Sequence, residues 1–201
     1  MNDIRQSFTE AKNLFNVPDL AASPPCLLFV LESPHKEEIK HGVPVAGGSG
    51  KTMTKYLLQE NVPFGIYLSK NPTLLKTFGI VNVCPFPMQS AAIPDEEWKD
   101  TNRLFLKTAE SIRTSTALKF KDEKKAVLQD ILLKDFKERL LQSAGEKTII
   151  VPCGKFAERY TFLAGIAETH RVITGVPHPS YNSWAKERYQ NTLSEMKEMI
   201  I

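Results

Sequence analysis

The sequence has little cysteine, no long hydrophobic run and no large excess of one charge. Its three cysteines, Cys26, Cys84 and Cys153, are widely spaced, which argues against a secreted disulfide scaffold and a paired-cysteine zinc site. No apolar run approaches the roughly 20 residues that a membrane span needs, and the N-terminus is too polar for a signal peptide. The 26 basic and 23 acidic residues give a net charge of +3, too small to identify a nucleic-acid binder by itself. We therefore expect a soluble, cytoplasmic monomer that binds no membrane.

The sequence does contain enough apolar residues to build one sizeable core. It has 201 residues, 42% of them hydrophobic, and we expect a single domain over 1–201 with an N-terminal helix and linker over 1–25. Compact apolar runs, typical of buried strands, occur at 26–31, 78–83, 147–151 and 171–176. Helical periodicity separates them, near 4–15, 51–60, 72–77, 95–114, 123–143, 154–164 and 184–199. This alternation predicts an α/β fold, a three-layer α/β/α sandwich with a mostly parallel four-stranded sheet.

Polar side chains stand at the ends of three of these strands. Glu32 follows the first strand, Asn82 lies near the end of the second, and His178 follows the fourth. Ligands of such sheets bind beyond the carboxyl ends of the strands, so we expect the three side chains to share one site. An amide can pair with the edge of a nucleobase, an imidazole can donate to a developing anion, and a carboxylate can orient water.

A glycine-rich segment, Gly47 to Thr52, invites comparison with a P-loop. The full P-loop pattern needs a glycine where Val45 stands and a strand directly before the loop, whereas the nearest strand ends at Leu31. We therefore do not favour an NTPase. A glycine-rich turn that opens a helix remains a good anion site, and we assign phosphate binding to Gly47, Gly48, Ser49, Gly50 and Lys51.

Four segments together resemble the motifs of the uracil-DNA glycosylase superfamily. They agree with it in order and spacing from about residue 27 to residue 183, and the bacterial and archaeal branch with an iron–sulfur cluster is the most similar. The segments are Glu32-Ser33-Pro34-His35 with the glycines that follow it, Val81-Asn82-Val83-Cys84-Pro85, Ile149 to Ala157, and His178-Pro179-Ser180.

The resemblance implies a role for each matching residue. Glu32 would assist the attack of water at the sugar carbon, Asn82 would read the base edge, and His178 would stabilise the departing base anion. The substrate would be a nucleotide flipped out of DNA. Further residues implied at the base are Ser33, His35, Val45 and Phe86, Ser180 would join the glycine turn at the phosphates, and Tyr181 or Asn182 would form the wedge in the duplex.

The sequence also departs from the family pattern. Val45 takes the place of the aromatic that stacks on uracil, which leaves Phe86 as the candidate stacking residue. Four thiolates cannot be assembled from three cysteines, so we expect no iron–sulfur cluster, no metal and no other cofactor. We expect a DNA glycosylase that removes uracil or another altered base. The alternative is a non-catalytic nucleic-acid or nucleotide-binding protein on the same fold.

Overall fold

The computed structural model describes residues 3–21 and 23–199. The expected N-terminal helix and linker therefore include Met1, Asn2 and Ala22, which lie outside the described residues. The N-terminal helix α1 spans Ile4–Phe15, as its apolar spacing predicts, and it buries Ile4, Phe8, Ala11 and Phe15 along one side.

Three parallel strands form the sheet within the described part of the chain. They are β1 (Leu27–Leu31), β2 (Phe78–Asn82) and β3 (Ile149–Pro152), in the order β2-β1-β3. In the register, Leu31 of β1 lies beside Asn82 of β2, and Val30 lies beside Pro152 of β3. The carboxyl ends of all three strands therefore meet at one edge of the sheet.

The predicted fourth strand at 171–176 is wrong as a strand. The segment reaches β3, where Ile150 N–H donates to Arg171 O and Ile173 N–H donates to Ile150 O, but only Val172 makes a parallel bridge. Gly175 then adopts a φ of 78°, in the left-handed region, and turns the chain out of the extended conformation that a ladder requires. The sheet is parallel as predicted, with three strands in place of four.

Most helices lie near their predicted positions. The helix α7 (Glu123–Ser143) coincides with its predicted range, and Asp122 caps it by accepting from Lys125 N–H. The predicted helix over 95–114 is two helices that divide at Asn102, and the predicted helix over 184–199 consists of 3₁₀ turns at Ser180–Ala185 and Glu187–Tyr189 followed by α9. The helices after α1 are α2 (Lys36–His41), α3 (Gly48–Leu58), α4 (Phe64–Lys70), α5 (Glu96–Thr101), α6 (Arg103–Thr114), α7 (Glu123–Ser143), α8 (Lys155–Leu163) and α9 (Gln190–Glu198). Further 3₁₀ turns are at Pro72–Lys76, Ser90–Ala92 and Ile166–Glu168.

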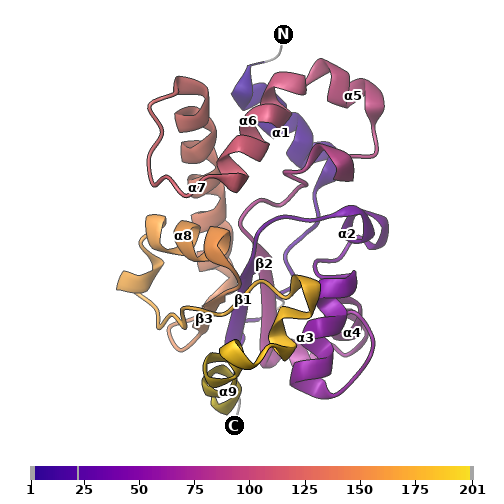
Figure 1. The fold of residues 1–201 in the computed structure, drawn as a ribbon, viewed down its shortest axis with the longest axis vertical. Coiled ribbons are helices and arrows are strands. Elements are labelled where there is room, and N and C mark those ends of the chain that lie inside the picture. The colour runs from indigo at the N-terminus through magenta and orange to yellow at the C-terminus, as the bar shows by residue number, and fades with distance from the viewer. Residues whose placement is uncertain (1–2, 22, 200–201) are drawn as a thin grey trace.

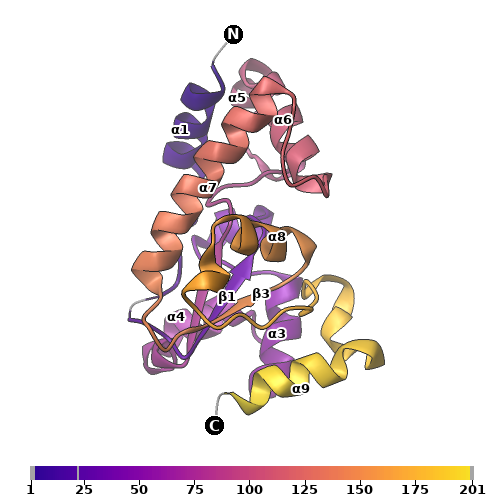
Figure 2. The ribbon, with the colours of Figure 1, turned by 90° about the vertical axis from the view of Figure 1, so that its left-hand side faces the viewer.

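Helices cover both faces of the sheet (Figures 1 and 2). Because side chains alternate along a strand, Leu28 and Val30 face one apolar cluster, whereas Leu27, Phe29 and Leu31 face the other. The first cluster joins the sheet to α1, α6, α7 and α8, and α7 runs along most of the molecule in Figure 2. The second joins it to α3, α4 and α9. No helix among residues 3–21 and 23–199 is long and apolar enough to cross a membrane.

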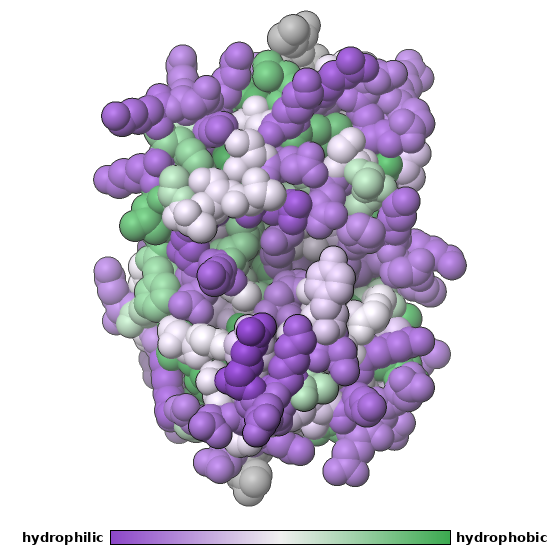
Figure 3. All heavy atoms as spheres, in the orientation of Figure 1, coloured by the Kyte–Doolittle hydropathy of each residue, from purple (hydrophilic) through white to green (hydrophobic). Residues whose placement is uncertain are grey.

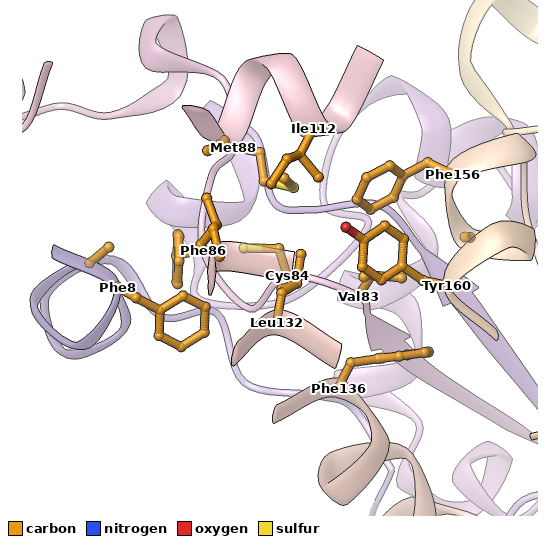
Figure 4. Packing of buried hydrophobic residues seen from close by; sticks show 14 of the residues in the cluster. Phe8, Val83, Cys84, Phe86, Met88, Ile112, Leu132, Phe136, Phe156 and Tyr160 are labelled. Atoms are coloured by element: carbon orange, nitrogen blue, oxygen red, sulfur yellow. The ribbon is translucent and has the colours of Figure 1, made fainter. Parts of the chain in front are cut away.

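The segment after β2 enters the first cluster and is held there by aromatic packing (Figure 4). Val83, Cys84 and Phe86 are at most 1% exposed, and the Phe86 ring meets the Phe8 ring edge-on at 5.1 Å. The chain beyond Asn82 is thus fixed by packing on the side of the sheet that carries α1 and α7.

Candidate active site

A pocket of about 540 Å³ lies at the carboxyl ends of the strands. It brings together Glu32, Asn82 and His178, which are far apart in the sequence. Three regions complete its wall: the segment around α2, the start of α3, and the turn after His178. The other lining residues are Leu31, Ser33, His35, Glu37, Glu38, Val45, Gly47, Gly48, Ser49, Gln89, Arg113, Ser180 and Tyr181.

Asn82 is the last residue of β2, and its side chain faces this pocket without a protein partner. The residue is 1% exposed, and neither Nδ2 nor Oδ1 has a hydrogen-bond partner among the described residues. A buried amide without partners costs free energy, and such exceptions in a native structure call for an explanation. A ligand that offers one donor and one acceptor side by side would satisfy both atoms.

His178 is oriented by the turn that follows it. Its Nδ1 accepts from the Ser180 backbone N–H at 3.2 Å and lies 3.0 Å from Ser180 Oγ. Because a backbone N–H can only donate, the neutral ring carries its proton on Nε2. Burial lowers the pKa of His178, which favours this neutral form. The ring is thus a neutral donor at the pocket.

Glycine is required behind His178. Gly154, at the turn between β3 and α8, has a φ of 93°, and an added Cβ would lie 2.9 Å from His178 Cβ. A side chain at this position would push the imidazole away from the pocket.

Glu32 follows β1 and is paired with an arginine. Arg113 Nη1 lies 3.3 Å from Glu32 Oε1, and both side chains are 22% exposed. Burial raises the pKa of Glu32, while Arg113 and a hydrogen bond from Gln89 oppose that rise. Arg113 and Gln89 were missed from the sequence because no motif marks them; only the docking of α6 places Arg113 against a residue 81 positions away.

The segment between β1 and α3 is fixed by Glu38. One carboxylate oxygen accepts from His35 N–H and the other from Val45 N–H, both at 2.7 Å, and burial raises the pKa of Glu38. This bridge holds His35 and Val45 at the pocket wall together with Ser33. Val45 adopts a φ of 54°, a strained conformation for a β-branched residue that the Glu38 bridge helps to maintain.

Only part of the glycine-rich segment Gly47 to Lys51 lines the pocket. Gly47, Gly48 and Ser49 line the pocket at the N-terminal end of α3, where the helix dipole favours an anion. Gly50 does not line it: a Cβ there would lie 2.0 Å from Val45 O, so this glycine permits close backbone packing. Lys51 is exposed on α3 and also lies outside the pocket lining.

Phe86 does not reach the pocket. Its burial against Phe8 and Phe105 in the core excludes the predicted stacking on a base. The two candidate wedge residues have different positions: Tyr181 is 93% exposed and lines the pocket mouth, whereas Asn182 lines a neighbouring hollow beside Tyr56 and Trp184. Both have a positive φ, 53° and 50°, as part of a tight turn.

The thiols do not suit a cluster that four cysteines hold. Cys84 and Cys153 are buried, Cys26 is exposed, and burial raises the pKa of both buried thiols. Among the residues that the structure describes, no group of three or more His, Cys, Asp or Glu side chains is placed to hold a metal ion.

Comparison with known proteins identifies the family of the chain. The family model for the uracil DNA glycosylase superfamily matches residues 18–200, which is nearly the whole chain. No curated protein matches the sequence. The match covers nearly the whole chain and fits the parallel sheet with a pocket at its carboxyl edge. The chain therefore belongs to the uracil DNA glycosylase superfamily.

Proposed function

We propose that this protein hydrolyses the N-glycosidic bond of uracil or another altered base in DNA, acting as a monomer with residues 1–201 as one domain. The observation that carries the proposal is the shared pocket of Glu32, Asn82 and His178, in which the buried Asn82 amide has no partner among the described residues. A flipped-out base whose edge offers one acceptor and one donor would complete that amide.

The bond would break with the base leaving as an anion. Water oxygen bonds to the sugar carbon, the bond from that carbon to the base nitrogen breaks, and its electron pair stays on the base. Glu32, held by Arg113 and Gln89, would orient the water and take its proton. His178 would donate from Nε2 to the developing anion without losing its own proton, since the neutral ring is favoured by burial.

The DNA backbone would bind at the rim of the pocket. Gly47, Gly48 and Ser49 lie there at the start of α3, and the Ser180 hydroxyl lies on the turn after His178, so these groups would contact phosphates. Hydrophilic side chains cover most of the face shown in Figure 3, on which α2, α3 and α8 lie. Tyr181, exposed at the mouth, would stack where the flipped base leaves the duplex.

The test is a panel of single- and double-stranded oligonucleotides that carry uracil, hypoxanthine, xanthine or a thymine mismatch. Alkaline cleavage after incubation reports abasic sites. We expect one of these bases to be released, and Glu32→Gln and His178→Asn each to lower the rate by about 10²-fold to 10⁴-fold. Glu37→Gln, at the same pocket but with a side chain 55% exposed, is the matched control.

One observation favours the second function, a non-catalytic nucleic-acid or nucleotide-binding protein. Arg113 partly neutralises Glu32, and a neutralised carboxylate stabilises a positively charged sugar less well. That function would show as oligonucleotide binding without any abasic product. Binding that is lost in Asn82→Ala, with no product from any oligonucleotide, would support it over hydrolysis.

A further inference from the structure

The outer edge of β2 needs partners where it reaches the pocket. β2 is an edge strand of the described sheet, and Leu20 pairs with it at Ile80, with N–H to O distances of 2.9 and 3.0 Å in the two directions. Asn82 is the next residue whose backbone N–H and C=O point to the same outer edge. Both groups are buried and need hydrogen bonds, but the antiparallel pairing has ended by this point.

Two charged side chains take the place of the missing strand. The Asn82 N–H donates to Asp19 Oδ1 at 3.4 Å, and Arg139 Nη2 donates to Asn82 O and to Val83 O at 2.9 Å each. Arg139 Nη1 also lies 2.9 Å from both oxygens of Asp19. Asp19 precedes Leu20, and Arg139 comes from α7, so the bonds tie β2 to two other parts of the chain.

Arginine fits this position because its planar group has five donors in a fixed fork. Nε donates to Asp135 Oδ2 at 2.8 Å, which directs the other two nitrogens toward Asp19 and the β2 carbonyls. The side chains of Arg139 and Asp19 are each 15% exposed. A lysine in this place would keep the charge but not the simultaneous bonds to two carbonyls and a carboxylate.

We propose that Asp19 and Arg139 form a clamp that positions Asn82 for recognition of the base, an inference that rests on the proposed function. Among the described residues, the Asn82 side chain has no hydrogen-bond partner to orient it, so its direction follows from the backbone that carries it. The clamp binds that backbone at the N–H and C=O of Asn82 and at the following carbonyl. Both are positioning residues that act on the substrate through Asn82.

The test compares Arg139→Lys with Lys12→Met, a control that breaks the ion pair between Lys12 and Asp135 in the same network. The measured quantity is kcat/KM for release of the base from the oligonucleotide substrate. We expect Arg139→Lys to lower it by about tenfold to a hundredfold, because the recognition group is then misplaced. Lys12→Met should leave it within about twofold. In the Asn82→Ala background, Arg139→Lys should cause no further loss, because the side chain that it positions is gone.

Equal losses from Arg139→Lys in the two backgrounds would overturn the clamp, since the arginine would then act elsewhere. If Arg139→Lys does not fold, Asp19→Asn, which keeps an acceptor oxygen, replaces it in the comparison of the wild-type and Asn82→Ala backgrounds. If the wild-type protein releases no base, the proposed function fails, and amide hydrogen exchange tests the clamp alone. Exchange at Asn82 should then be faster in Arg139→Lys than in the wild type and Lys12→Met, and unchanged exchange would overturn it.

Discussion

Two polar groups lie on opposite sides of the end of β2, and they differ in how fully they are bonded. On the outer side, Arg139 and Asp19 satisfy each other and the Asn82 backbone. On the pocket side, the Asn82 amide has no partner among the described residues. Buried polar groups that are satisfied contribute to stability, and one that is unsatisfied costs free energy unless a ligand completes it. The contrast separates residues that hold the fold from the side chain that we propose for recognition of the base.

The largest effect on the free energy of unfolding should come from removing the Arg139 hydrogen bonds on the outer side of β2. Arg139→Met leaves Asp19 buried without its cation, leaves Asp135 with Lys12 alone, and removes the donor to the carbonyls of Asn82 and Val83. We expect the free energy of unfolding to fall by about 3–5 kcal/mol, measured by urea denaturation. Arg103→Met is the matched control, because Arg103 pairs with Asp100 on the exposed surface and its loss should stay within about 0.5 kcal/mol.

A smaller effect on the free energy of unfolding should come from changing Gly154, the residue that lies behind His178 on the pocket side. Gly154→Ala places a side chain at a φ of 93° and within 2.9 Å of His178 Cβ. We expect a loss of about 1–3 kcal/mol in the free energy of unfolding, together with a lower rate of base release. Gly48→Ala is the control, since nothing lies within 4 Å of a Cβ built there. Equal stability of the two variants would contradict this account.

The pocket side should tolerate the loss of its unpaired amide. Asn82→Leu removes two buried polar atoms without protein partners and keeps a side chain of similar size. We expect the free energy of unfolding to rise by about 1 kcal/mol, the opposite of the Arg139→Met result, while base release becomes slower. A destabilisation of more than about 1 kcal/mol would show that the amide is bonded within the protein.

The sequence predicts the pocket better than it predicts what surrounds it. Glu32 follows β1, Asn82 ends β2, and His178 follows the segment that bridges to β3, so the predicted order of apolar runs is enough to bring them to one edge. Arg113 and Arg139 carry no local motif, and their contacts depend on how α6 and α7 dock. Phe86 was misplaced because an aromatic residue in a loop after a strand can turn to either side, and Phe8 from α1 provides the apolar side.

The fourth strand was overestimated for a related reason. Arg171 to Val176 has the composition of a strand, but Pro152, the next donor that the ladder requires from β3, has no N–H, and Gly175 then turns into the left-handed region. The same turn lets Gly154 N–H donate to Val176 O at 2.8 Å, close to His178. The strand count and the position of His178 thus depend on hydrogen bonds between β3 and 171–176 that an apolar run alone does not reveal.

The smallest predicted effect concerns pH and distinguishes His178 from the carboxylates. Burial lowers the pKa of His178 below 6.5, so the unfolded chain binds more protons than the folded one at mildly acidic pH. The stability that the neutral ring contributes should be present near neutral pH and be lost as the pH falls below about 6.5. Burial raises the pKa values of Asp19, Glu32 and Glu38, so protonation of these groups acts in the opposite direction.

The measurement therefore compares the free energy of unfolding of the wild type with that of a His178 variant. The contributions of the carboxylates, which both proteins share, cancel in the difference. We expect the free energy of unfolding of the wild type minus that of His178→Asn to decrease between about pH 7.5 and pH 5. Burial is the cause, and protonation would also place a proton on Nδ1 against the Ser180 N–H, which already donates to it at 3.2 Å. A difference that stays constant over this range would show that the imidazole titrates alike in both states. His178 would then not be held as the neutral donor that the proposed departure of the base requires.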